Sequence, residues 1–225
     1  MRAALGFLTP LGGARTPSPR ALPWFPVVGA LIGVGVGGAW WVGTEVWNPA
    51  VGAALAIVTD LALTGMLHVD GLGDSADGLL PHLPPERRLE VMRQPDIGAY
   101  GVAAIGGVLL LRFAVLTSIA PHVGLVVAAW AVTRGIAAIT LASLPYARPG
   151  GLAEVFRGRS PLATIALAVA AVGLAIASPW AVLACGVGFG AVLLLAVRRV
   201  GGYTGDVLGA GIVVAETLAL LAAAA

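Results

Sequence analysis

VGLVVAAWAVTRGIAAITLASL (Val123–Leu144) is an apolar run whose only charged residue is Arg134. Its length is close to the roughly 20 residues that a helix needs to cross the hydrocarbon core of a bilayer. Apolar residues surround the expected helix on every side, whereas a soluble domain would alternate them with a solvated face. We interpret this run as a transmembrane helix, and similar runs recur along the 225 residues, of which only 11% are charged.

These runs predict an all-α polytopic integral membrane bundle, because a backbone in lipid must satisfy its own hydrogen bonds. The whole chain, residues 1–225, is expected to form a single domain. Gly29, Gly33 and Gly37 recur at four-residue spacing, which favours close helix packing. We expect about seven transmembrane helices, over Phe25–Gly43, Ala50–Leu67, Gly101–Ala120, Val123–Leu144, Pro161–Ser178, Trp180–Val197 and Val207–Ala225.

The arginines predict the orientation, because positively charged loops stay in the cytoplasm. Every second connection carries them, which places the N-terminus in the cytoplasm and the C-terminus outside. A net charge of +2, spread over membrane loops, gives no reason to expect nucleic-acid binding. The loop arginines are Arg2, Arg15, Arg20, Arg87, Arg88, Arg93, Arg148, Arg157, Arg159, Arg198 and Arg199.

Charged residues inside the predicted spans need partners, because an unpaired charge in the bilayer is costly. Arg112 and Arg134 lie in mid-span, and Glu216 in the last span is a plausible partner. Asp60 is interpreted as structural, with Arg112 as its candidate partner. Cys185 is the only cysteine, so neither a disulfide within the chain nor a cysteine-based metal site is expected.

HVDGLGDSADG (His68–Gly78) places three carboxylates directly after an apolar run. Asp70, Asp74 and Asp77 fall within an arc of about 60° on one helix face. Carboxylates crowded near lipid repel one another unless a cation lies among them, and Mg²⁺ prefers such oxygen ligands. The interleaved glycines suggest a locally unwound helix. The alternative is that the aspartates are solvated at the membrane boundary and bind nothing.

GGYTGDVLGA (Gly201–Ala210) is a second polar element, expected on the same side of the membrane. It places Thr204 and Asp206 at the start of the last span, where helix-start amides can hold a phosphate. Carboxylates on two segments, with nearby arginines, are the groups needed to bind a metal-bridged pyrophosphate. The pattern therefore indicates phosphoryl transfer at the cytoplasmic face.

HVDGLGDSADG closely resembles the signature of the cobalamin synthase family, the adenosylcobinamide-GDP ribazoletransferases. Other segments resemble the family in the same order along the chain. They are TPSPRALPWFPVVGALIG (Thr16–Gly33), RLEVMRQPDIGAYG (Arg88–Gly101), TRG (Thr133–Gly135), YARPGGL (Tyr146–Leu152) and GGYTGDVLGA.

The resemblance implies a Mg²⁺-dependent transferase of the cell inner membrane. It would join adenosylcobinamide-GDP to α-ribazole, or its 5′-phosphate, releasing GMP and forming adenosylcobalamin or its phosphate. The expected partners are these substrates and the lipid bilayer, with a homo-oligomer left open. Carried over by position, the implied metal ligands are Asp70, Asp74, Asp77 and Asp206, the first three also being catalytic together with His68. The implied substrate-binding residues are Arg93, Arg134, Arg148, Arg157, Thr204, Asp206 and Glu216.

The chain departs from the family at Gln94-Pro95-Asp96, where an acidic residue replaces a basic one. The preceding PERRLEVMRQ (Pro85–Gln94) predicts either a short amphipathic helix at the membrane surface, with Leu89 and Met92 on one face, or a solvated connector. Two other functions remain alternatives. One is a CDP-alcohol phosphotransferase acting on a lipid, and the other is an ion-coupled transporter.

Overall fold

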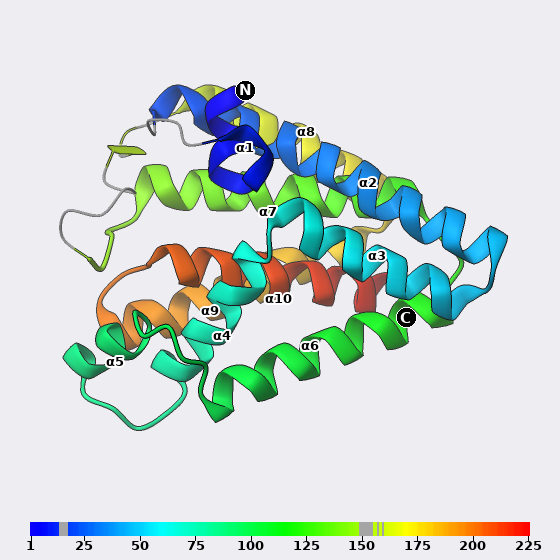
Figure 1. The fold of residues 1–225 in the computed structure, drawn as a ribbon. Helices are drawn as coiled ribbons and strands as arrows, with labels where there is room; N and C mark the ends of the chain where they lie inside the picture. The colour runs from blue at the N-terminus through cyan, green and yellow to red at the C-terminus, as the bar shows by residue number, and fades with distance from the viewer. Residues whose placement is uncertain (14–17, 149–154, 157, 159) are drawn as a thin grey trace.

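The computed structural model describes residues 1–13, 18–148, 155–156, 158 and 160–225, and the elements there are helical (Figure 1). The all-α prediction is confirmed. The α-helices are α1 (Arg2–Leu8), α2 (Phe25–Val46), α3 (Pro49–Thr64), α4 (Leu67–Leu79), α5 (Pro85–Val91), α6 (Ala99–Ser118), α7 (Val123–Ser143), α8 (Pro161–Ala177), α9 (Pro179–Val200) and α10 (Gly205–Ala223). Two short 3-10 helices, η1 (Pro10–Gly12) and η2 (Pro19–Trp24), precede α2.

Each predicted span falls on a helix, but these helices differ in their capacity to cross a membrane. Five helical segments in the described part of the chain are long and apolar enough, namely the continuous stretch Pro19–Val46, α6, α7, α9 and α10. α3 has 16 residues and α8 has 17, which gives lengths of about 24–26 Å against a core of about 30 Å. The chain is therefore a multi-pass membrane protein, and the count of seven crossings stays a prediction.

The second predicted span, Ala50–Leu67, ends too late. α3 stops at Thr64 because Gly65 and Met66 both adopt the left-handed conformation, with φ of 58° and 60°. The chain then turns by 88° into α4. α4 is one uninterrupted α-helix that contains the whole acidic motif, so the local unwinding expected there is absent. The break lies before the motif and not within it.

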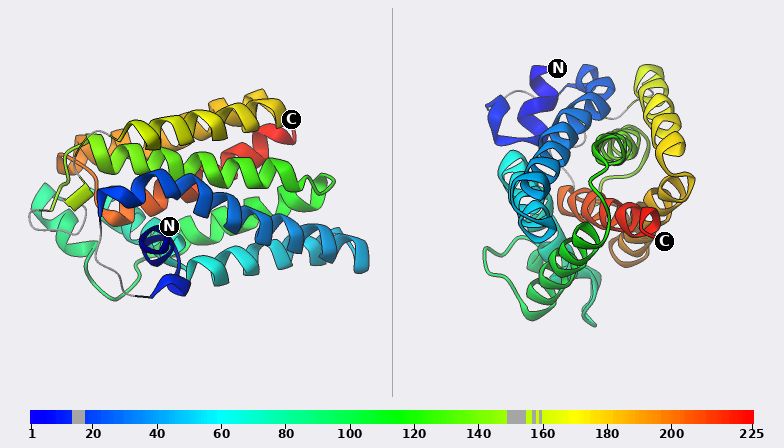
Figure 2. Two further views of the ribbon diagram at one scale, coloured as in Figure 1. Left: turned by 90° about the horizontal axis from the view of Figure 1, so that it is seen from above. Right: turned by 90° about the vertical axis from the view of Figure 1, so that its right-hand side faces the viewer.

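Small residues let the helices of the core approach closely, as predicted for α2. A Cβ atom on Gly29 would stand 2.3 Å from the Trp130 carbonyl oxygen, and one on Gly33 would stand 2.7 Å from the Val127 Cα. The end view in Figure 2 shows α7 and α10 inside the bundle, and both are mostly buried. α6 and α9 instead expose most of their apolar surface, as helices that face lipid do.

The predicted helix after the acidic motif is present as α5, but it packs on α4. Arg88 is buried, and its Nη1 donates to the carbonyl oxygens of Gly78 and Leu79, each at 2.9 Å. Met92 is buried too, and a Cβ on Gly78 would be 2.3 Å from the Met92 Cγ. The segment therefore caps the C-terminus of α4, which the amphipathic pattern alone did not predict.

Candidate functional site

A cavity of about 480 Å³ lies where α1, the bend between α3 and α4, α7 and the first turns of α10 meet. Its polar lining comes from His68 and Asp70 of α4 and Asp206 of α10, together with the Thr9 and Thr64 residues near the bend. The remaining lining is apolar or glycine: Gly6, Phe7, Leu8, Pro10, Phe25, Gly65, Leu67, Ala137, Leu141, Gly205, Leu208, Gly209 and Ile212. The cavity thus has a charged part and an apolar part.

Close contact between α4 and α10 brings the two acidic motifs together. A Cβ on Gly71 would stand 2.7 Å from the Asp206 carbonyl oxygen, and one on Gly209 would stand 3.1 Å from the His68 Cα. Only glycine allows backbones to approach to this distance. The glycines of HVDGLGDSADG therefore serve helix packing and not flexibility.

The four aspartates do not share one environment. Asp70 is exposed and Asp74 is half-buried, and the carboxylate of Asp74 lies in the electrostatic field of those of Asp206, Asp70 and Asp77. Asp77 is buried and faces the start of α6. Its two carboxylate oxygens accept hydrogen bonds from the backbone amides of Gly98 at 2.7 Å and Gly101 at 2.9 Å. Asp77 thereby ties the first turn of α6 to α4.

Asp206 pairs with Arg148, whose Nη2 lies 3.0 Å from its Oδ2. Thr204 is the N-cap of α10, because its Oγ1 accepts from the Val207 amide at 3.3 Å, and it also donates to Asp206 at 3.2 Å. Arg148 is held nearby because the backbones of Ala147 and Tyr203 are joined by a hydrogen bond of 2.8 Å. The Arg148 Nε is buried without a hydrogen-bond partner in the described part of the chain.

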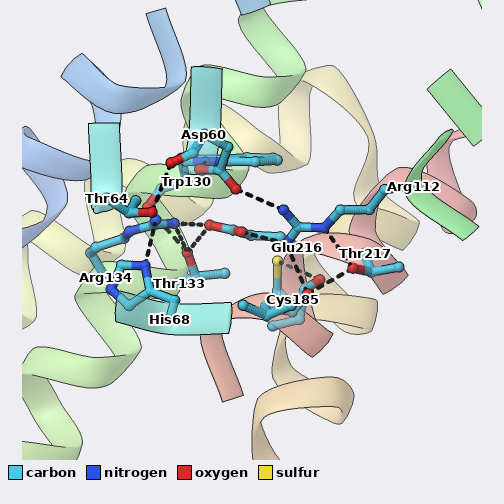
Figure 3. Close-up of polar contacts among 12 residues, drawn as sticks. Asp60, Thr64, His68, Arg112, Trp130, Thr133, Arg134, Cys185, Glu216 and Thr217 are labelled. Carbon is cyan, nitrogen blue, oxygen red and sulfur yellow. Dashed lines mark hydrogen bonds and ion pairs between the residues drawn. The ribbon is translucent and has the colours of Figure 1, made fainter. Parts of the chain in front are cut away.

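A buried charge network lies next to His68 (Figure 3). Glu216 accepts from Arg112 Nη2 at 2.7 Å and forms an ion pair with Arg134. Arg112 also donates to Asp60 at 2.8 Å, and Trp130 donates to the same carboxylate at 2.9 Å. The expected pairing of Arg134 with Glu216, and of Asp60 with Arg112, is confirmed.

Two arginines and two acids make this network neutral, and it joins α3, α6, α7 and α10. Arg134 and Glu216 are 0% and 1% exposed and do not line the cavity. In this structure they lock helices together, and contact of either residue with a substrate stays a prediction.

His68 connects the network to the cavity. Its Nδ1 lies 3.4 Å from the Arg134 Nη2, and its side chain lines the cavity. A guanidinium can only donate, so Nδ1 must be the acceptor, and the proton of the neutral ring is then on Nε2. Arg134 therefore sets His68 as a hydrogen-bond donor through Nε2.

The other sequence-predicted residues lie apart or outside the described chain. Arg93 is exposed in the connection between α5 and α6, as are Gln94, Pro95 and Asp96, so the departure from the family pattern falls on solvent-exposed residues. Arg157 lies outside the described residues. Sequence reasoning missed the wall formed by α1, although the apolar run in RAALGFL (Arg2–Leu8) was an available signal.

The aspartates predicted to bind a metal ion do not form a compact set of ligands in the described part of the chain. Asp70, Asp74 and Asp206 supply the carboxylate oxygens that Mg²⁺ prefers, on two helices in close contact. Among the described residues, no three His, Cys, Asp or Glu side chains converge closely enough to hold a metal ion. Magnesium binding therefore stays a prediction.

Fold and site together define a polytopic membrane protein with a half-apolar cavity that carries carboxylates and an adjacent arginine. Comparison with known proteins gives the family: residues 1–224 match the cobalamin-5-phosphate synthase family, and the chain belongs to it.

Curated relatives of the chain carry the name adenosylcobinamide-GDP ribazoletransferase. One from Citrobacter koseri is 35% identical over 90% of this chain and 87% of its own length. One from Bradyrhizobium diazoefficiens is 36% identical over 100% of this chain and 93% of its own length. No solved structure matches the chain.

Proposed function

We propose that this protein is an adenosylcobinamide-GDP ribazoletransferase, which performs the final assembly step of the cobalamin nucleotide loop. Its substrates are adenosylcobinamide-GDP and α-ribazole or its 5′-phosphate. Membership of the family and relatives of that name over nearly the whole chain support this activity. The structural observation that carries it is that Asp70 and Asp206 line one cavity, with Arg148 paired to Asp206.

The reaction exchanges a phosphoanhydride bond for a phosphate ester bond. A ribose hydroxyl oxygen of the acceptor forms a bond to the phosphorus that carries cobinamide. The bond from that phosphorus to the bridging oxygen breaks, and GMP leaves with this oxygen. The hydroxyl proton passes to a carboxylate, for which Asp70 and Asp206 are the candidates that line the cavity. The product is adenosylcobalamin or its phosphate.

Two side chains, Arg148 and His68, can donate hydrogen bonds to the negatively charged pyrophosphate. The Arg148 guanidinium already lies beside Asp206, and such a group can donate hydrogen bonds to non-bridging phosphate oxygens. His68, with Nε2 protonated, can donate a hydrogen bond to an oxygen at the cavity wall. Both groups favour a ligand that carries negative charge at the α4–α10 contact.

We further propose that Mg²⁺ is required, held by Asp70, Asp74 and Asp206. Bound there, the ion would neutralise charge on the phosphoryl oxygens and on the leaving GMP. Mutual repulsion of these carboxylates favours a cation among them.

We propose that the protein lies in the cell inner membrane and that its site faces the cytoplasm. Figure 1 draws α5 and the α9–α10 turn at one end of the bundle, with the α2–α3 and α6–α7 connections at the other. α5 contains Arg87 and Arg88, and the last turn of α9 contains Arg198 and Arg199. This segregation of arginine supports a cytoplasmic position for the first end under the positive-inside rule.

The direct test uses purified protein in detergent with adenosylcobinamide-GDP and α-ribazole. We expect GMP release and a cobalamin product with Mg²⁺, and loss of both on removal of the metal by EDTA. Asp74→Asn should lower turnover by roughly 100-fold or more, and Asp96→Asn, on an exposed residue outside the cavity, is the matched control. Normal turnover by Asp74→Asn would refute the metal role. Release of CMP from a CDP-alcohol, or solute flux in liposomes without turnover, would point to the alternatives.

A further inference from the structure

The cavity is divided into a part that suits hydroxyl groups and a part that suits an aromatic ring. Asp70 and Asp206 lie in the first part. The second is built from Phe7, Leu8, Phe25, Leu141, Leu208 and Ile212. No arginine lines the cavity within the described part of the chain, and Arg148 is paired to Asp206 at its polar part.

The size of the cavity limits which ligand can enter it as a whole. At about 480 Å³ it falls within the roughly 300–1,000 Å³ typical of sites for drug-sized ligands. A nucleoside with a two-ring base is of that size. A corrinoid that carries guanosine diphosphate is several times larger and cannot enter as a whole.

We propose that this cavity binds the acceptor nucleoside, with its aromatic base in the apolar part and its ribose hydroxyls at Asp70 and Asp206. This inference rests on the proposed function. The corrinoid then approaches from outside the cavity, on the side of Arg148. The acceptor hydroxyl lies at the carboxylates, where its proton can be taken.

The N-terminal helix α1 is the element that completes the aromatic part. Phe7 is half-buried, with its ring centroid 5.5 Å from that of Phe25 and 5.2 Å from that of Phe156. Phe7 and Phe25 both line the cavity, so a base seated there meets two phenyl rings. α1 thus acts as a wall of the acceptor site, not as an inert leader to the first span.

The test is equilibrium binding of α-ribazole and, separately, of adenosylcobinamide-GDP to the full-length protein in detergent. Phe7→Ala should raise the Kd of α-ribazole by roughly 10-fold, because it removes one stacking surface, and leave the Kd of adenosylcobinamide-GDP unchanged. Phe7→Leu keeps an apolar side chain against Phe25. It should raise the Kd of α-ribazole by a smaller factor and again leave the Kd of adenosylcobinamide-GDP unchanged. Leu162→Ala, in a separate groove lined by Pro19 and Trp24, is the matched control and should alter neither Kd.

Three results would overturn the inference: no binding of α-ribazole to the wild-type protein, an unchanged Kd in both Phe7 variants, or an equal loss for both substrates. The α-ribazole 5′-phosphate, measured in the same way, should share the response to Phe7 because it carries the same base. Failure of the proposed function is a different outcome, since it appears as absent GMP release by the wild-type protein.

Discussion

Glu216→Gln tests whether the buried network stabilises the bundle by charge balance. Glu216 is 1% exposed and neutralises both Arg112 and Arg134. The substitution keeps the shape of the side chain but leaves one positive charge uncompensated. Removing one partner of a buried ion pair costs about 3–5 kcal/mol. Arg112 still has Asp60, whereas Arg134 keeps, among the described residues, the polar contacts to Thr133 and His68.

The assay can use the single cysteine. Cys185 is buried, so a thiol-reactive fluorophore reports its exposure as the protein unfolds on heating. For a chain of this size we expect the midpoint to fall by roughly 10 °C. Glu45→Gln, on an exposed glutamate at the end of α2, should leave the midpoint unchanged.

A double variant separates charge from packing. Arg134→Met with Glu216→Met removes one charge of each sign and leaves the Asp60–Arg112 pair intact. Because apolar replacement of a whole ion pair is often neutral, the double variant should recover most of the lost stability. The reasoning is refuted if Glu216→Gln melts like the wild type, or if the double variant is no more stable than the single one.

Three further substitutions probe the site. Gly71→Ala would place a Cβ 2.7 Å from the Asp206 carbonyl oxygen. We expect the purified variant to be about 1–3 kcal/mol less stable and to turn over more slowly. Gly106→Ala is the control, because its Cβ would meet no atom within 4 Å, and it should change neither stability nor turnover. Asp77→Asn keeps only one accepting oxygen for the amides of Gly98 and Gly101, so thermal unfolding should show a loss of about 1–3 kcal/mol. Arg148→Lys keeps the charge but loses the planar fork, so the KM for adenosylcobinamide-GDP should rise roughly 10-fold; an unchanged KM would contradict the phosphate-binding role.

The sequence by itself determined the class of fold and the neighbourhood of the chemistry. Hydrophobic length alone placed each predicted span on a helix, because a backbone in lipid has few other ways to satisfy its hydrogen bonds. The cost of unpaired charge in a bilayer predicted that Arg112 and Arg134 need partners, with Asp60 and Glu216 as the candidates, and the structure pairs Arg134 with Glu216 and Arg112 with Asp60.

Only the tertiary structure determined which groups each side chain of the motifs contacts. Asp70, Asp74 and Asp77 are equivalent by helical spacing, yet packing against α6 turns Asp77 to backbone amides, while contact with α10 leaves Asp70 at the cavity. The left-handed pair Gly65 and Met66 set the bend that aims α4, and α1 closed a wall that no motif marked. Periodicity fixes neighbours within one helix, but only the packing of different helices determines which carboxylate meets an arginine, an amide or open space.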